Sequence, residues 1–109
     1  MMQVGRVGLW LAVMGGAVVL WAGCTPRESA TAGDEIYRNQ CAGCHGADLA
    51  GRGSFPAVGK DSKAAGMSDV ELTKVIEDGP RGMPSFSGRL DDAQVAAVIA
   101  YLREVQATP

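Results

Sequence analysis

The sequence predicts an all-α fold of three to four helices joined by loops rich in glycine and proline. Apolar residues recur at helical spacing near the C-terminus, at Val95, Val98, Ile99 and Leu102. Helix start and stop signals frame a second segment further upstream, and no stretch of useful length alternates apolar and polar residues as a strand does. The 109 residues include 15 Gly and 5 Pro, so one small domain is the upper limit.

Residues 1–23 are predicted to be an export signal of the lipoprotein type. An apolar run of sixteen residues follows Arg6 and carries no charge. This is short for a membrane-spanning helix, which needs about 20 residues, and it suits a signal peptide. The run ends in Trp21-Ala22-Gly23-Cys24, which resembles a bacterial lipobox, although Trp21 stands where that motif usually has Leu. We expect lipidation at Cys24, with an uncleaved anchor or a free thiol after ordinary cleavage as the alternatives.

The charge balance argues against nucleic acid as a partner. The chain has 10 Lys and Arg against 12 Asp and Glu. Cleavage before Cys24 would leave 86 residues without Arg6, so nine basic residues would face twelve acidic ones, a formal net charge of −3. Such a chain is a poor ligand for nucleic acid and for anionic lipid, so membrane attachment must come from a lipid or an anchor.

The domain is expected at residues 33–109, after a short flexible tether at residues 24–32. The tether is predicted because these residues are small and polar and lack apolar periodicity. The first helix is predicted from about Asp34 to Gln40, with acidic residues in its first turn, where the helix dipole favours them.

The run Cys41-Ala42-Gly43-Cys44-His45 carries the chemistry of the chain. Two thiols at this spacing can add to the vinyl groups of a c-type haem while the next imidazole reaches the iron. A redox-active dithiol, half of a zinc site and coincidence are the alternatives. A thioredoxin-like dithiol follows a buried strand, which this sequence lacks, and structural zinc needs four ligands. We therefore expect one covalent haem c, attached through Cys41 and Cys44, with His45 on the iron.

Two loops and two helices are predicted after this motif. Glycines and prolines break residues 46–60 into a loop along the haem edge. A capping box at Ser68–Glu71 opens a helix that Gly79 ends, a second loop spans 81–88, and the last helix runs from about Leu90 to Val105. The apolar haem contacts expected in the first loop are Leu49, Phe55 and Val58.

Residues 33–104 resemble a class I cytochrome c, of the small monohaem bacterial kind that is exported and lipid-anchored. Gly33 and Tyr37 lie eight and four residues before the haem motif, where this family has a glycine and an aromatic residue on its first helix. Ala100-Tyr101-Leu102 resembles the signature of the family's last helix. The resemblance implies that the two helices cross steeply, with Gly33 and Tyr37 against Val98 and Tyr101.

The iron of a carrier needs a second axial ligand, because six-coordinate iron has no vacancy for oxygen or peroxide. Once the leader is removed, Met67 and Met83 remain of the five methionines. Met67 is expected to be core filler or a surface residue beside the Ser68 cap. Met83 precedes Pro84 in a loop 38 residues after His45, which resembles the family's distal-ligand loop. We expect His45 and Met83 as the axial ligands.

The surroundings of the haem follow from the same resemblance. It implies that His45 donates its other ring N–H to the carbonyl of Pro56. Both Trp10 and Trp21 lie in the leader, so the domain lacks the indole that some relatives place near a haem propionate. Candidates for that role, each of which can also be a solvated surface charge, are Arg52, Lys60, Arg81 and Arg89.

The function implied is that of a membrane-tethered one-electron carrier in a respiratory chain, on the outer or periplasmic side of a bacterial cell membrane. The partners implied are a quinol–cytochrome c reductase and a terminal oxidase or other reductase, and a monomer is expected. The alternative is a haem enzyme subunit, a peroxidase or nitrite-reducing protein with a displaceable distal ligand. A haem-based sensor would need a signalling module for which the mature chain has no room.

Overall fold

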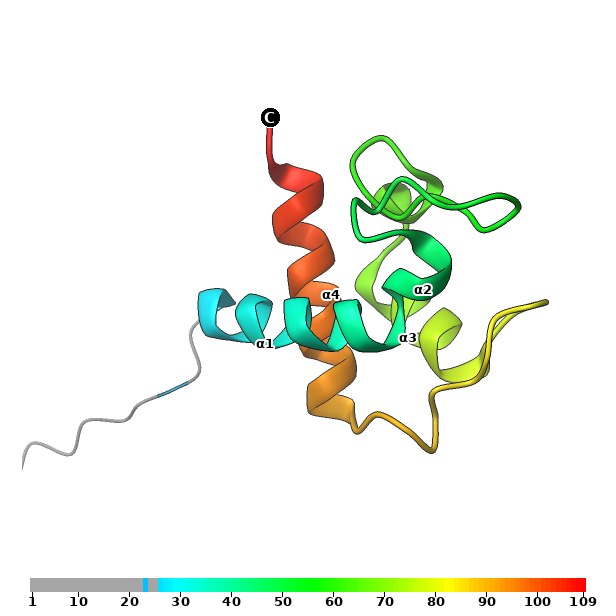
Figure 1. Cartoon of the computed structure of the whole chain (residues 1–109). Helices are drawn as coiled ribbons and strands as arrows, with labels where there is room; N and C mark the ends of the chain where they lie inside the picture. The colour runs from blue at the N-terminus through cyan, green and yellow to red at the C-terminus, as the bar shows by residue number, and fades with distance from the viewer. Residues whose placement is uncertain (1–22, 24–25) are drawn as a thin grey trace, which may run out of the picture.

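The computed structural model describes residue 23 and residues 26–109 (Figure 1). Apart from Gly23, the predicted export signal lies outside these residues, and so does Cys24. The elements are α1 (Pro26–Gln40), α2 (Ala42–His45), the 3-10 helix η1 (Lys63–Gly66), α3 (Asp69–Asp78) and α4 (Asp92–Ala107). Within the described part of the chain the only β pairing is an isolated bridge between Arg52 and Phe55, which confirms the all-α prediction. None of the described helices is long and apolar enough to cross a membrane.

The helices α1 and α4 cross each other and form the centre of the core (Figure 1). At Gly33 the two backbones are so close that a Cβ atom would lie 1.9 Å from the carbonyl oxygen of Ala97. One turn further along α1, Tyr37 is 1% exposed, and its ring centroid lies 5.4 Å from that of Tyr101. Val98 is buried in the same cluster. The predicted crossing is therefore confirmed, and it needs glycine because any side chain would hold the helices apart.

The start of α1 was placed too late by the sequence. The helix begins at Pro26, so most of the segment predicted as a flexible tether is helical. Proline is well suited to the first turn of a helix, where its missing N–H has no partner to lose, and the alanines that follow favour helix. The prediction relied on apolar periodicity, which this segment lacks.

Helix caps fix the ends of α3 and α4. The Ser68 hydroxyl accepts from the N–H of Glu71 and the Glu71 carboxylate accepts from the N–H of Ser68, so the predicted capping box is confirmed. Asp91 and Gln94 form a second capping box at the start of α4. At its other end α3 stops at Gly79, whose φ of +65° is left-handed. These caps satisfy N–H groups that would otherwise lack partners, and they set where the intervening loops leave the helices.

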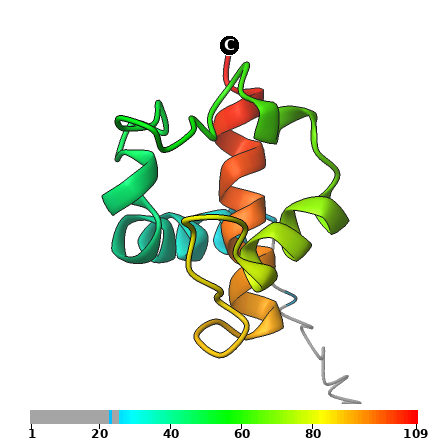
Figure 2. The same cartoon turned by 90° about the vertical axis from the view of Figure 1, so that its right-hand side faces the viewer.

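The view in Figure 2 shows how the elements surround the site. There α4 runs vertically at the centre, with α2 and its following loop on one side and η1 and α3 on the other. The loop after α3 returns across the lower part of this arrangement before α4 begins. The haem motif and the two predicted loops therefore face a common space in front of α4.

Candidate cofactor site

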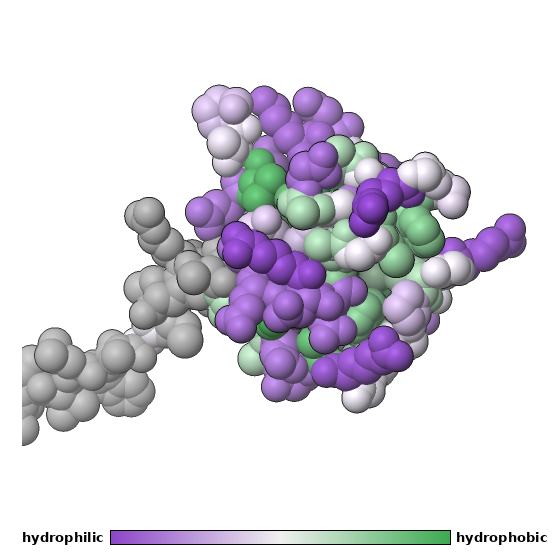
Figure 3. All heavy atoms as spheres, in the orientation of Figure 1, coloured by the Kyte–Doolittle hydropathy of each residue, from purple (hydrophilic) through white to green (hydrophobic). Residues whose placement is uncertain are grey.

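A cavity of about 350 Å³ lies between α2, the loops, α3 and α4. This volume falls in the range of roughly 300–1,000 Å³ that is typical of cofactor sites. Its lining is mainly apolar, and Figure 3 shows apolar residues gathered toward the side of the molecule where the loops after α2 and α3 lie. Five predicted site residues all line this one cavity: Cys41, Cys44, His45, Pro56 and Met83.

The helix α2 places the haem motif on a single turn. Cys41, Cys44 and His45 lie at positions i, i+3 and i+4, which share one face of a helix. The N–H of His45 donates to the carbonyl of Cys41 at 3.0 Å, which closes the turn. One turn of helix is thus enough to aim both thiols and the imidazole at the same space.

The imidazole of His45 is oriented by the loop that follows α2. Its Nδ1 lies 2.7 Å from the carbonyl oxygen of Pro56, the contact that the resemblance implies. Because a carbonyl only accepts, Nδ1 must carry a proton, and in the neutral imidazole Nε2 then has the free lone pair. The loop itself is held by Leu49, whose carbonyl accepts from the N–H groups of both Val58 and Gly59.

The first loop, residues 46–60, brings two of its three expected apolar residues to the cavity. Phe55 and Val58 line the cavity, and Phe55 is 42% exposed where it does so. Leu49 is 4% exposed and belongs to the core, but it is not among the lining residues, so its predicted haem contact is wrong. Its φ of +62° lies in the left-handed region, which is uncommon for a residue other than glycine.

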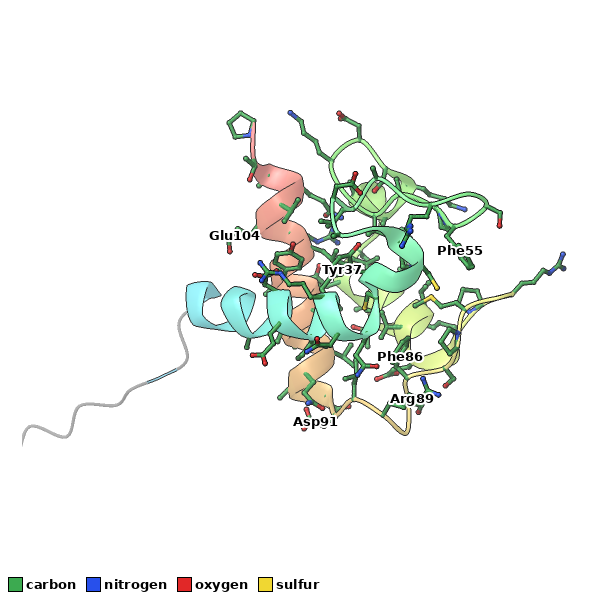
Figure 4. The ribbon with its side chains drawn as sticks, in the orientation of Figure 1. Tyr37, Phe55, Phe86, Arg89, Asp91 and Glu104 are labelled. Atoms are coloured by element: carbon green, nitrogen blue, oxygen red, sulfur yellow. The ribbon has the colours of Figure 1, made fainter. Side chains whose placement is uncertain are left out.

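The second loop folds back over the end of α3 and brings Met83 to the cavity. The N–H of Met83 donates to the carbonyl of Pro80 at 2.8 Å, and the N–H of Phe86 donates to that of Ile76 at 3.1 Å. Under this loop lies Gly79, where a Cβ would come within 2.7 Å of the Met83 carbonyl oxygen. Figure 4 shows sulfur atoms gathered between α2 and this loop. Met67 also lines the cavity, half-buried in the wall formed by η1, so both methionines that the sequence left open are present.

Two cations and no acidic residues line the cavity. Arg81 is one of the four predicted candidates, and Lys63 is a residue that the sequence analysis did not consider. Arg52, Lys60 and Arg89 are not among the lining residues, and the Arg89 guanidinium lies over the Phe86 ring (Figure 4). Lys63 could not be singled out because it follows the segment predicted as the haem-edge loop, in a 3-10 helix that carries no sequence signal of its own.

The alternatives of dithiol and zinc site fit this cavity poorly. Cys41 and Cys44 are not joined by a disulfide. Burial, with a smaller effect of Cys44, raises the pKa of the Cys41 thiol to about 11, whereas a redox-active dithiol has a lowered pKa. Among the described residues no group of three or more His, Cys, Asp and Glu side chains could hold a metal ion. Two thiols, one oriented imidazole, a thioether and apolar walls are instead the donor set and surroundings that a covalent haem requires.

Comparison with known proteins agrees with this chemistry. The family described as cytochrome C oxidase, cbb3-type, subunit III matches residues 28–102. Dihydro-heme d1 dehydrogenase of Pseudomonas aeruginosa is 34% identical over 92 residues, which cover 83% of this chain and 18% of that protein. The cytochrome bc1 complex cytochrome c subunit of Corynebacterium diphtheriae is 32% identical over 79 residues, covering 71% of this chain and 27% of that protein. Cytochrome c-551 of Bacillus subtilis is 30% identical over 84 residues, covering 75% and 69%. The chain therefore spans less than a third of the first two relatives and about two thirds of the third.

Proposed function

The chain belongs to the class I cytochrome c family and carries a covalently bound c-type haem, and from this premise we propose that it is a one-electron carrier tethered to a bacterial cell membrane. The haem supplies a one-electron redox couple. We assign Cys41 and Cys44 to its thioether bonds and His45 and Met83 to the two axial positions of its iron. The observation that supports this assignment is the single apolar cavity that these four side chains line from two separate segments.

Each residue has a distinct task in such a carrier. The hydrogen bond from His45 to Pro56 leaves Nε2 as the ligand atom and fixes the plane of the ring. The soft thioether of Met83 would favour ferrous iron and would occupy the position that oxygen or peroxide needs. The apolar walls keep water away, which disfavours the more highly charged ferric state. Together these residues support electron transfer and oppose ligand chemistry.

The partners proposed are a quinol–cytochrome c reductase as donor and a terminal oxidase or other reductase as acceptor. The names of the matched family and of the Corynebacterium diphtheriae relative, a cbb3-type oxidase subunit and a bc1 complex subunit, support this choice. The relative named as a dehydrogenase shares only 18% of its length with this chain, so the alternative of a haem enzyme gains little from it. We propose that the carrier is monomeric.

The tether proposed is a lipid on Cys24, which would place the domain on the outer or periplasmic face of the membrane. The support is the apolar run and the lipobox-like residues before Cys24. The variant Cys24→Ser should be released from membranes or remain unprocessed. A variant that stays membrane-bound at its processed size would rule out this tether.

The two cavity methionines allow a matched test of the carrier function. Met83→Ala should lower the reduction potential, abolish the weak far-red band of a methionine–ferric bond and allow rapid cyanide binding. A fall of about 59 mV is a tenfold loss of preference for the ferrous state, and removing the ligand should exceed this several times. Met67→Ala should leave all three properties close to those of the unaltered protein. The reverse pattern would make Met67 the ligand, and no response from either variant would favour the enzyme over the carrier.

A further inference from the structure

One wall of the cavity depends on side chains of α4 for its attachment. This wall, residues 58–67, contributes Val58, Lys63, Ala64 and Met67 to the cavity lining. Its own backbone hydrogen bonds either stay within the segment or end on the carbonyl of Leu49 in the preceding loop. Among the described residues no backbone bond of the wall reaches α1, α3 or α4. Its position relative to the helices therefore depends on side chains, both on the apolar packing of Val58, Ala64 and Met67 against the core and on polar side chains of α4.

Arg103 and Gln106, on the last two turns of α4, supply that attachment. The Arg103 guanidinium donates to the carbonyl oxygens of Met67 and Ala65, the latter at 3.4 Å. It also donates to Gln106 Oε1 at 2.8 Å, and Gln106 in turn donates from Nε2 to the carbonyl oxygen of Val58 at 2.9 Å. One connected pair of side chains thus holds both ends of the wall, including the backbone of Met67 itself.

Arg103 also forms an ion pair with Asp69, but this pair contributes less to the attachment of the wall than the hydrogen bonds to backbone carbonyls do. Arg103 Nε lies 2.9 Å from Asp69 Oδ1, but the Asp69 side chain is 69% exposed, and exposed pairs contribute little. The carbonyl bonds are part-buried, and losing the donor would leave acceptors without a partner. The guanidinium suits this task because its planar donors can serve several acceptors at once, which an ammonium group cannot do in the same geometry.

We propose that Arg103, together with Gln106, is a positioning residue that clamps the 58–67 wall against α4, keeps water out of the cavity and holds Met67 in the wall. The proposal rests on the carrier function proposed above, in which a dry cavity and a single thioether ligand set the potential. Without the clamp the wall would open, and water would reach the site. The ferric state would then gain stability, and external ligands would bind faster.

The test compares Arg103→Met, which keeps a long apolar stem and removes every donor, with the unaltered holoprotein. Amide hydrogen exchange at Val58 and Gly59, whose N–H groups bond outside the wall to the Leu49 carbonyl, should accelerate about tenfold as the wall opens. A lost hydrogen bond of the kind that Arg103 makes is worth about that factor. Cyanide should bind the ferric protein about tenfold faster. A tenfold shift toward the ferric state would lower the potential by about 59 mV. Exchange within the α1–α4 crossing should stay unchanged, which a general loss of stability would not allow.

Three further variants separate the contribution of the Arg103–Asp69 ion pair from that of the hydrogen bonds to the wall. Asp69→Asn removes the ion pair alone and should change none of these properties. Lys74→Met is the matched control, because it removes an exposed ion pair with Asp78 that lies away from the wall. Gln106→Leu frees the Val58 carbonyl and removes one acceptor of Arg103, but it leaves the Arg103 bonds to Ala65 and Met67 in place. It should act in the same direction but less strongly, so it serves if Arg103→Met does not fold. Unchanged exchange in the wall would disprove the clamp whatever ligates the iron. Faster exchange with unaltered potential and cyanide binding would disprove its link to the haem.

Discussion

The α1–α4 crossing and the Met83 loop both depend on a glycine at a close backbone contact, but the two contacts do different work. At Gly33 the contact lies between two helices in the core, among side chains such as Tyr37 that are nearly inaccessible to solvent. At Gly79 the contact lies between the end of α3 and the exposed loop that carries Met83. The first lies beside apolar core side chains, and the second is supported by a few backbone hydrogen bonds.

This difference suggests that stability and redox chemistry are set in separate places. Burial of apolar side chains such as Tyr37 and Val98 at the crossing contributes to the folding free energy of the domain. The loop adds Phe86 to the core but is otherwise mostly exposed, and it determines where a ligand side chain lies relative to the cavity. Changes at the crossing should therefore alter unfolding more than the iron, and changes under the loop should do the reverse.

The largest effect on stability is expected from Gly33→Val. A Cβ at this position would lie 1.9 Å from the Ala97 oxygen and 2.9 Å from Tyr101 Cβ, so the helices must separate. We expect a loss of about 3 kcal/mol in the free energy of unfolding, measured by denaturant titration. Gly88→Val is the control, because a Cβ there would meet nothing within 4 Å. Equal unfolding midpoints for the two variants would contradict the role given to the crossing.

Gly79→Ala should destabilise the domain less than Gly33→Val does, but it should change the properties of the iron more. The left-handed backbone and a Cβ 2.7 Å from the Met83 carbonyl oxygen should together cost about 2 kcal/mol and displace the loop. The far-red methionine band should weaken and the potential should fall, as spectroscopy and voltammetry would measure. Gly53→Ala shares the positive φ but has no neighbour within 4 Å, so it controls for backbone strain alone. If both variants shifted the potential equally, the Gly79 contact would not be what positions Met83.

Tyr37→Phe tests whether the two regions are independent, because Tyr37 belongs to the crossing and reaches the haem motif. Its hydroxyl donates to the Gly46 carbonyl at 2.7 Å, and burial raises its pKa well above the usual range, so it remains a donor. Losing this buried bond should cost about 1.5 kcal/mol of stability. The potential should hardly change, since His45 keeps its bond to Pro56. A marked fall in potential would mean that the crossing also orients the iron ligands.

The parts of the fold that the sequence predicted are those encoded by local signals. The Ser68 capping box, the left-handed Gly79 and the apolar spacing of α4 each act within a few residues, and each is confirmed. The steep crossing required a family resemblance, because nothing local to Gly33 says which helix it contacts. The start of α1 at Pro26 was missed because the residues before Asp34 carry no apolar stripe that would signal a helix.

The residues of the candidate site likewise divide into those that the sequence could identify and those that it could not. The haem motif, Pro56 and Met83 could be named from spacing and resemblance, and the structure places them at one cavity, while their roles toward iron stay predictions. Lys63 and Arg103 could not be named. Arg103 meets Ala65 and Met67 across 38 and 36 residues, and an arginine on a helix looks the same in sequence whether it is solvated or bonded to a distant backbone.

The smallest effect is expected from Ser68→Ala, at the end of α3 away from the Met83 loop. Losing the cap should reduce stability by about 1 kcal/mol near neutral pH and leave the potential unchanged. The hydrogen bonds with Ser68, chiefly the one from its backbone N–H, lower the pKa of the Glu71 carboxyl below its usual value. A lowered pKa contributes stability above the unfolded-state value of about 4.3, and this contribution is lost as the pH falls through the folded-state pKa. Ser68→Ala keeps the backbone N–H, so both proteins lose its contribution together as the carboxyl is protonated. The difference between their unfolding curves should therefore narrow at low pH only by the part that comes from the Ser68 hydroxyl. A gap that stayed constant with pH would show that the Ser68 hydroxyl acts without Glu71, and a shift in potential would show that the start of α3 also affects the iron.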